Sequence, residues 1–248
     1  MVLNFGLLGY PLKNKFSVDY FTQKFKSENL AHTYQNFEFE TLSEIQSFIR
    51  GKENLGGLNV TKPYKEKVIA LMDELSEEAQ SCGALNCIQF LESGKLKGHN
   101  TDVYGFRKSL ENFIGSDRKI KALVLGNGGA SKAVCFVLNK LNIPYLIVSR
   151  RKIKNANEID YSDVNLDIVE AYKLIINTTP VGMFPDEKAK LGINFDGLGP
   201  MHFCFDLIYL PEKTEFLIEA ERKGAQIKNG LEMLHLQAEE AYRIWMTG

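Results

Sequence analysis

The chain has 248 residues with 44% hydrophobic and 25% charged side chains, and its formal net charge is −1. These values are typical of a soluble globular protein with one large domain or two of ordinary size. They give no electrostatic reason to expect nucleic acid or an anionic membrane as a partner. No apolar run approaches the ~20 residues of a membrane span, and the apolar N-terminus lacks the basic leader of a signal peptide.

Cysteine and histidine usage argues against a metal centre. The four cysteines form no Cys-x-x-Cys pair, and the four histidines have no metal-ligand spacing. We therefore expect no metal site. The scattered thiols favour a reducing environment and a cytoplasmic location.

Strand-like and helix-like segments alternate through the chain, which predicts an α/β fold with mainly parallel sheets. In the first half, strands are predicted at residues 3–8, 33–39, 85–90 and 95–99, the last two as a hairpin around Ser93-Gly94. Helices are predicted from about Ser17, from a Thr41–Glu44 capping box, over residues 74–79 and from Asp102.

The second half begins after a shift in composition at residues 115–117, and we divide the chain near Asp102. Strands are predicted at residues 120–125, 145–148, 174–176 and 203–205, and helices at 133–141 and 231–245. Residues 153–167 are polar and have no clear pattern, so no element is predicted there.

The stretch Asn59-Val60-Thr61-Lys62-Pro63-Tyr64-Lys65 continues from a predicted strand into a turn. Pro63 fixes its own φ and restricts the residue before it, so the turn is held in one shape. Val68, Ile69 and Met72 follow at helical spacing, which places Lys65 in the first turn of a helix. Because a cation is unfavourable at a helix N-terminus, Lys65 is either a solvated surface residue or one retained for function.

The segment Gly126-Asn127-Gly128-Gly129-Ala130-Ser131 lies between a predicted strand and a predicted helix. Glycines at such a junction let the backbone turn tightly and approach a pyrophosphate, whose charge a helix N-terminus favours. Ser131 replaces the third glycine of the usual fingerprint and is still small. An ordinary tight turn is the alternative, and the strand–loop–helix context favours dinucleotide binding.

The next predicted strand is followed by Ser149-Arg150-Arg151-Lys152-Ile153-Lys154. A cofactor without a 2′-phosphate usually meets an acidic residue here, which hydrogen-bonds the ribose. Four basic side chains and no acid favour the phosphorylated cofactor, NADP, over the alternative of a solvated basic turn.

Two further polar stretches leave alternatives open. Residues 177–182 follow a strand at the edge where ligands bind in open α/β sheets, although a plain polar loop fits equally well. Asp102 begins a helix, where a simple N-cap is the default interpretation, and Asn86 is interpreted as a turn residue.

Together these motifs resemble the shikimate dehydrogenase family along nearly the whole chain. Asn-Val-Thr-x-Pro-x-Lys is intact at residues 59–65, Gly-x-Asn-Thr-Asp at 98–102 and Gly-x-Gly-Gly-Ala-Ser at 126–131. Residues 83–87 are similar to the family's Gly-Ala-Val-Asn-Thr with two substitutions, and residues 206–209 and 230–238 are also similar.

The resemblance implies NADP-dependent reduction of 3-dehydroshikimate to shikimate, in the pathway to aromatic amino acids. It implies Lys65 and Asp102 as the catalytic pair, in which the ammonium stabilises the developing alkoxide and supplies a proton. The implied substrate contacts are Asn59, Thr61, Asn86, Tyr209 and Gln237, together with Lys65 and Asp102. The implied cofactor contacts are Gly126, Asn127, Gly128, Gly129, Ala130, Ser131, Ser149, Arg150, Arg151, Lys154, Thr178, Leu207 and Gly230, to which Glu77 is added.

One stretch departs from the family. The family usually shows Pro-Leu-x-His-Ser-x-Ser, whose two serines hold the substrate carboxylate, whereas this chain has Pro11-Leu12-Lys13-Asn14-Lys15-Phe16-Ser17. Ser17 matches the second serine, Asn14 replaces the histidine and Lys15 replaces the first serine. We expect Lys15 to contact the carboxylate directly; crowding of the pocket and an outward-turned side chain are the alternatives.

We therefore expect a two-domain α/β enzyme with a cleft between its domains. Residues 1–101, joined by the C-terminal helix of about 230–248, would form an α/β substrate-binding domain with a mainly parallel sheet, and residues 102–229 a Rossmann-type NADP-binding domain. A quinate or quinate/shikimate dehydrogenase is the nearest alternative. A non-catalytic dinucleotide-binding sensor is another, and it would not need Lys65 and Asp102. The expected partner is the small-molecule substrate, a homodimer is left open, and neither nucleic acid nor membrane is expected.

Overall fold

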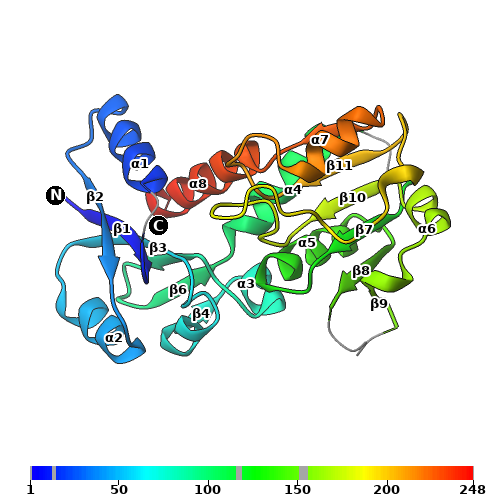
Figure 1. The fold of residues 1–248 in the computed structure, drawn as a ribbon. Coiled ribbons are helices and arrows are strands. Elements are labelled where there is room, and N and C mark those ends of the chain that lie inside the picture. The colour runs from blue at the N-terminus through cyan, green and yellow to red at the C-terminus, as the bar shows by residue number, and fades with distance from the viewer. Residues whose placement is uncertain (1, 13–14, 116–118, 151–155, 248) are drawn as a thin grey trace. The chain divides into compact units, whose positions relative to one another are not determined.

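The computed structural model describes residues 2–12, 15–115, 119–150 and 156–247 (Figure 1). The chain divides into two compact units, the first comprising Met1–Thr101 with Gln237–Gly248 and the second Asp102–Leu236. Helices α4 (Thr101–Ile114) and α8 (Leu231–Met246) carry the chain from one unit to the other. Each unit contains a six-stranded sheet with helices, so the predicted α/β fold class is confirmed.

The sheet of the first unit has the strand order β2-β1-β3-β5-β6-β4. Its strands are β1 (Asn4–Gly9), β2 (Thr33–Glu38), β3 (Leu55–Val60), β4 (Glu74–Leu75), β5 (Cys87–Phe90) and β6 (Leu96–His99). The β1–β2, β1–β3 and β4–β6 pairs are parallel, whereas β3–β5 and β5–β6 are antiparallel. The β5–β6 pair is the predicted hairpin, and the sheet as a whole is mixed.

Helices cover both faces of this sheet, because its strands alternate their apolar side chains between two cores. Helix α2 (Leu42–Gly51) and the 3-10 helix η1 (Lys67–Leu71) pack on one face, where Leu8, Ile45 and Leu58 are fully buried. Helix α1 (Phe16–Ser27) and the end of α8 pack on the other through the buried aromatic rings of Phe5, Phe21, Phe25 and Trp245. Gly57 of β3 permits this packing, since a Cβ there would lie 2.3 Å from the Trp245 ring.

Two local predictions in the first unit are wrong. Lys65 does not lie in a helix: Tyr64 N–H donates to the Thr61 carbonyl at 3.0 Å and closes a turn, and η1 begins only at Lys67. The predicted helix over residues 74–79 begins later, at Glu77, because Ser76 is its N-cap and accepts from Ala79 N–H at 3.2 Å. The two residues before the cap form β4, which pairs with β6. Helix α3 therefore spans Glu77–Cys82.

The default interpretation of Asp102 as an N-cap is also wrong, and Asn86, which lies at a bend just before β5, does more than form a turn. Helix α4 begins at Thr101, so Asp102 is its second residue and not its N-cap. The Thr101 N–H donates to Asn86 Oδ1 at 2.7 Å. Asn86 is therefore a buried side chain that satisfies the helix start from outside the helix, a more specific role than that of a turn residue.

The sheet of the second unit has the order β12-β11-β10-β7-β8-β9, and all its pairings are parallel. Its strands are β7 (Ala122–Leu125), β8 (Tyr145–Ser149), β9 (Glu158–Asp160), β10 (Leu174–Asn177), β11 (Phe203–Asp206) and β12 (Gln226–Lys228). Numbered along the chain within this unit, the order is 3-2-1-4-5-6, which is that of the Rossmann fold. The sheet order reverses between β7 and β10, and ligands bind at such a point.

The helices of this unit include α5 (Gly129–Lys140), α6 (Leu166–Ala171) and α7 (Glu215–Arg222), with short 3-10 turns η2 (Tyr161–Asp163) and η3 (Phe195–Gly197). Helix α7 buries Phe216, Leu217 and Ala220 against the sheet. Neither α7 nor β12 was predicted, and β9 and α6 occupy part of the stretch in which no pattern was found.

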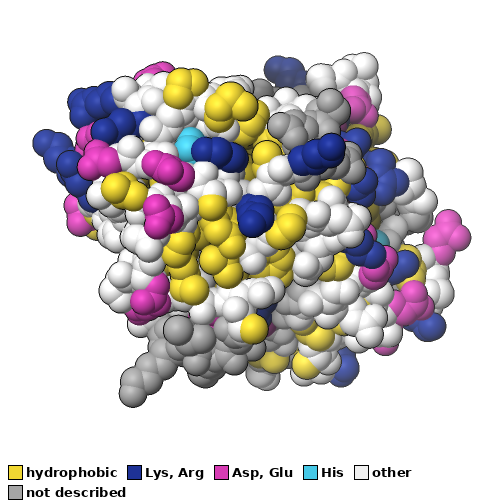
Figure 2. Space-filling view, turned by 90° about the vertical axis from the view of Figure 1, so that its right-hand side faces the viewer, with side chains coloured by type: hydrophobic (Ala, Val, Ile, Leu, Met, Phe, Trp, Pro, Cys, Tyr) yellow, Lys and Arg dark blue, Asp and Glu magenta, His cyan; other side chains and the backbone are white. Residues whose placement is uncertain are grey.

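Charged side chains of both signs are interspersed on the face shown in Figure 2. That distribution agrees with the net charge of −1. Within the described part of the chain, no helix has both the length and the apolar character needed to cross a membrane, and no cluster of side chains could hold a metal ion.

Candidate active site

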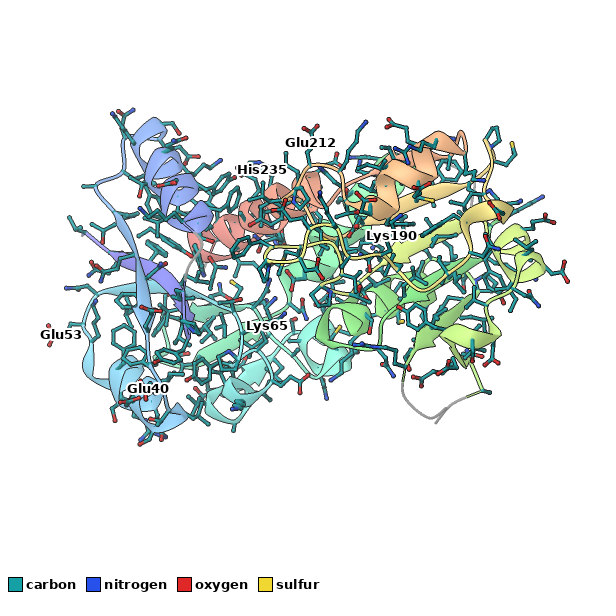
Figure 3. The ribbon with its side chains drawn as sticks, viewed as in Figure 1. Glu40, Glu53, Lys65, Lys190, Glu212 and His235 are labelled. Carbon is teal, nitrogen blue, oxygen red and sulfur yellow. The ribbon has the colours of Figure 1, made fainter. Side chains whose placement is uncertain are left out.

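Lys65 lies on the connection that leaves the carboxyl end of β3 (Figure 3). The backbone around it is fixed from two sides: Leu85 N–H donates to the Lys65 carbonyl at 2.8 Å, and the buried Tyr64 hydroxyl donates to the Phe39 carbonyl at 2.5 Å. The Lys65 side chain is half-buried. The loop therefore presents an ammonium group from a backbone that has little freedom to move.

A chain of polar side chains, which we call the amide network, crosses the first unit beside this loop. The Tyr34 hydroxyl donates to Asn59 Oδ1 at 2.8 Å, and Asn59 Nδ2 donates to the Asn86 carbonyl at 3.3 Å. Asn86 Oδ1 accepts from Thr101, whose hydroxyl also donates to Gln237 Oε1 at 3.3 Å. Three predicted substrate contacts, Asn59, Asn86 and Gln237, are thus held in one hydrogen-bonded array.

The N-terminal end of α1 joins the same array. Ser17 makes a side-chain hydrogen bond with Tyr34, and burial raises the pKa of the Tyr34 phenol well above its usual value, so the phenol stays protonated and donates to Asn59. Lys15 is the N-cap residue of α1 and is exposed. Asn14 lies outside the described residues. Thr61 is half-buried at the end of β3, and its N–H donates to the Leu8 carbonyl at 2.8 Å.

The glycine loop of the second unit follows β7 and opens α5. Gly126 has φ +105°, a left-handed conformation that favours glycine, and a Cβ there would lie 2.8 Å from the Thr178 hydroxyl. A Cβ at Gly128 or Gly129 would meet no atom within 4 Å, so space is open in front of the helix. Gly128 is the N-cap and has no capping side chain, which leaves the first N–H groups of α5 able to bind an anion.

These loops line a cavity of about 850 Å³ at the carboxyl ends of β7, β8 and β10. Its lining residues are Gly126, Asn127, Gly128, Ser149, Arg150, Tyr161, Thr178, Thr179, Pro180, Val181, Lys190, Leu191 and Gly192. Six predicted cofactor contacts are among them. The cavity lies where the order of the sheet reverses, and residues 178–181 line it, so the polar stretch at 177–182 is more than a plain loop.

The wall formed by the end of β8 is polar and charged. The Ser149 hydroxyl and the Asn127 amide both donate to Glu158 Oε1, at 2.7 and 2.8 Å. Arg150 is exposed and lines the cavity, and its charge opposes the rise that burial produces in the pKa of Tyr161. Arg151 and Lys154 lie outside the described residues.

The remaining predicted contacts of the second unit lie around β10 and β11. The Thr178 hydroxyl donates to the Leu125 carbonyl at 2.8 Å and ties the end of β10 to the end of β7, from which the glycine loop continues. Gly230 lies against Leu207, where a Cβ would come within 2.1 Å of the Leu207 carbonyl oxygen. Tyr209 is half-buried in the connection after β11. Ala130 and Ser131 belong to the first turn of α5, and the Ser131 hydroxyl donates to the Gly128 carbonyl at 2.7 Å.

Asp206 ends β11 and is buried. It accepts from the Thr214 hydroxyl at 2.6 Å, from Asn177 Nδ2 at 3.1 Å and from Ile208 N–H at 3.0 Å. Burial raises the pKa of the Asp206 carboxyl to about 6, and these hydrogen bonds oppose the rise. The side chain thus joins the ends of β10 and β11 beneath the connection that carries Tyr209.

Comparison with known proteins places the chain in a family. The model of the shikimate dehydrogenase substrate binding domain matches residues 7–88. A shikimate dehydrogenase (NADP+) of Staphylococcus aureus strain MRSA252 is 35% identical over 98% of this chain and 92% of its own length. The chain belongs to the shikimate dehydrogenase family.

Solved structures of shikimate dehydrogenases have the same fold. The enzyme from Aquifex aeolicus superposes with a TM-score of 0.89 at 31% identity, covering 100% of this chain and 93% of that one. The enzyme from Thermus thermophilus, solved in complex with NADP(H) and shikimate, gives a TM-score of 0.86 at 31% identity, covering 100% and 94%. The part matched by the substrate-binding domain, residues 7–88, lies within the first unit.

Several residues of this candidate shikimate dehydrogenase site could not be identified from any motif in the sequence. Tyr161 and Lys190 both line the cavity, and neither lies in a recognisable motif. Tyr161 belongs to η2, and Lys190 lies in the long loop after β10 (Figure 3). Tyr34 reaches Asn59 only because β1, β2 and β3 are neighbours in the sheet.

Among the described residues, Asn100 Oδ1 is the one buried side-chain polar atom without a hydrogen-bond partner. Of the predicted cofactor contacts, Glu77 is the described residue that belongs to the first unit, where it begins α3.

Proposed function

We propose that this chain catalyses the reversible, NADPH-dependent reduction of 3-dehydroshikimate to shikimate. The observation that carries the proposal is the cavity at the reversal point of the second sheet, in a chain that is similar along its length to shikimate dehydrogenases. The first unit would bind the substrate and the second the cofactor.

The residues of the cavity suit NADPH, which supplies the hydride when it is bound. The open space at Gly128 and Gly129 and the uncapped start of α5 suit a pyrophosphate. Arg150, Arg151 and Lys154 would bind the 2′-phosphate, for which guanidinium groups are well suited. Asn127, Ala130, Ser131, Thr178, Leu207 and Gly230 would shape the remainder of the site, with Glu77 as a further candidate.

The amide network suits a polyhydroxylated acid. Asn59, Thr61, Asn86, Tyr209 and Gln237 would hydrogen-bond its hydroxyls, and Ser17 with Lys15 would hold its carboxylate. Because the amides are already oriented by one another, little freedom remains to be lost when the substrate binds.

Lys65 and Asp102 would form the catalytic pair. Adding hydride to a ketone leaves negative charge on the oxygen, which the Lys65 ammonium would stabilise and then protonate. Asp102 would hold the ammonium in position and accept a hydrogen bond from a substrate hydroxyl. The alternative of a solvated Lys65 fits less well with a half-buried side chain on a fixed loop.

A reduction assay tests the proposal directly. The purified chain is mixed with 3-dehydroshikimate and NADPH, the loss of NADPH absorbance is followed, and the product is compared with shikimate by chromatography. The same preparation is tested with NADH, and in the reverse direction with shikimate and with quinate. Faster oxidation of quinate than of shikimate would support a quinate dehydrogenase instead. Binding of NADPH without turnover of either acid would support a sensor.

The role of Lys15 needs its own variant. If Lys15 contacts the carboxylate, Lys15→Ser raises the KM for shikimate and leaves kcat nearly unchanged, because binding in ground and transition states is weakened alike. Lys26→Ser removes an exposed lysine from the other end of the same helix and serves as the control. An unchanged or lower KM in Lys15→Ser would exclude the contact.

We further propose a cytoplasmic location, supported by four cysteines that are thiols, three of them buried. A homodimer stays a prediction, which sedimentation of the purified chain would test.

A further inference from the structure

Glu158 is a buried carboxylate for which the proposed reaction has no use. It is the first residue of β9, is 3% exposed, and pairs in register with Ile147 of β8. Its Oε1 accepts both the Asn127 amide, at 2.8 Å, and the Ser149 hydroxyl, at 2.7 Å. Buried carboxylates are rare unless paired, so this one requires an explanation.

The two donors identify the place that Glu158 controls. Asn127 belongs to the loop after β7 and Ser149 ends β8, and both line the cavity. Glu158 therefore ties together the two strand ends between which the adenosine ribose would lie. Glu158 does not itself line the cavity; it lies behind Asn127 and Ser149, which line the cavity together with Arg150.

The hydrogen bond fixes what Ser149 can offer a ligand. A serine hydroxyl has one hydrogen, and a carboxylate oxygen can only accept it. With that hydrogen directed to Glu158, Ser149 has none to donate to a phosphate. The donors for a 2′-phosphate must then come from basic side chains, of which Arg150 and Lys190 are the described ones that line the cavity.

The charge of Glu158 has a second effect. A buried negative charge is poorly screened, so it repels a phosphate dianion at the 2′ position but not a neutral hydroxyl. We propose that Glu158 is a specificity-determining residue that limits the preference for a 2′-phosphorylated cofactor and positions Ser149 and Asn127. The inference rests on the proposed cofactor site.

The test compares adenosine 2′,5′-bisphosphate with adenosine 5′-monophosphate, which lacks the 2′-phosphate. Their Kd values for the full chain are measured by titration calorimetry in the wild type and in Glu158→Gln. Glutamine has the same shape, and its oxygen can still accept from Ser149 and Asn127, so the substitution removes the charge and keeps the hydrogen bonds. We expect the ratio of the two affinities to shift toward the bisphosphate by at least about threefold.

Asp167→Asn is the matched control, because it removes the same charge from an exposed helix start outside the cavity. If the role of Glu158 is purely structural, Glu158→Gln weakens the binding of both ligands alike and leaves the ratio of their affinities unchanged. That result would overturn the proposal. So would an equal shift in Asp167→Asn.

Ser149→Ala provides a test that does not depend on the folding of the glutamate variant. If the serine hydrogen is committed to Glu158, no donor to the 2′-phosphate is lost, and the affinity ratio does not fall. A ratio that falls severalfold shows that Ser149 donates to the phosphate and contradicts the inference. If the wild-type chain binds neither adenosine phosphate, the proposed cofactor site itself is wrong, and this outcome is distinct from a failure of the inference on Glu158.

Discussion

Three candidate substrate residues of the first unit belong to one hydrogen-bonded array, whereas the candidate cofactor site of the second unit depends largely on the backbone of its glycine loop. In the amide network, Asn59, Asn86 and Gln237 are each oriented by a partner from another element. Around the cavity, the decisive features are open space at glycines and a helix start whose N-cap, Gly128, offers no capping side chain. The first arrangement is sensitive to the loss of one polar atom, and the second to the addition of one carbon.

Loss of Lys65 should have the largest effect, because it removes a group that acts in the reaction itself. We expect Lys65→Ala to lower kcat by about 10²- to 10⁴-fold, with a much smaller change in the KM for shikimate. Steady-state kinetics with shikimate and NADP+ measure both values. Lys62→Ala is the control, since it removes an exposed ammonium from the same turn. A kcat that is unchanged in Lys65→Ala would remove Lys65 from the mechanism.

Adding one carbon at Gly230 tests the backbone contacts of the second unit. The new Cβ would lie 2.1 Å from the Leu207 carbonyl oxygen and 2.7 Å from its carbon, and backbone atoms cannot move aside as a side chain can. We expect Gly230→Ala to lower the free energy of unfolding by about 1–3 kcal/mol, measured by urea denaturation.

Gly129→Ala makes the same chemical change where no atom lies within 4 Å. It should alter the unfolding free energy by no more than about 0.5 kcal/mol. Equal destabilisation by the two variants would show that close backbone approach is not what distinguishes these glycines.

Asp206 is the exception in the second unit, a buried side chain whose effect depends on pH. Its folded-state pKa of about 6 lies above its ordinary value of 3.8. Its contribution to stability is therefore fully present below about pH 4 and is lost as the pH rises through about 6. Between about pH 4 and pH 6, we expect the free energy of unfolding of the wild type to fall by about 2 kcal/mol relative to that of Asp206→Asn.

Urea denaturation at a series of pH values measures that difference. Asp186→Asn, which replaces an exposed carboxylate, should leave the pH dependence as it is in the wild type. Parallel pH profiles for the wild type and Asp206→Asn would contradict the raised pKa.

The same contrast explains how far the sequence alone could predict the molecule. The glycine loop and the basic end of β8 were recognisable because their function depends on local backbone shape and charge, which neighbouring residues determine. The parallel sheet of the second unit and the β5–β6 hairpin followed from the alternation of apolar segments and from Ser93-Gly94, whereas the sheet of the first unit is mixed. The start of α3 after Ser76 and the turn closed by Tyr64 escaped prediction, since an N-cap and the pairing of β4 with β6 override helical spacing at the first, and a local hydrogen bond does so at the second.

Contacts between distant elements could not be predicted in this way. Tyr34 lies 25 residues from Asn59 and Glu158 lies 9 residues from Ser149, and no periodicity reports such pairings. Lys190 likewise reaches the cavity from a loop without a motif. Helix α7 and strand β12 are short, and their apolar residues are too few to stand out without the sheet on which they pack.

The smallest of the expected effects comes from a single hydroxyl of the amide network. Tyr34→Phe removes the donor to Asn59 Oδ1 and leaves a buried acceptor without a hydrogen. We expect a loss of about 1–2 kcal/mol in unfolding free energy, together with a higher KM for shikimate at nearly constant kcat, because Asn59 loses its orientation.

Tyr242→Phe is the matched control, because its hydroxyl donates to Glu28 at the surface of the same unit. Water can replace that bond, so its removal should cost less than about 1 kcal/mol and leave the KM for shikimate unchanged. If the two variants change the KM equally, the amide network does not orient the substrate, and the contrast between the two units then rests on the glycines alone.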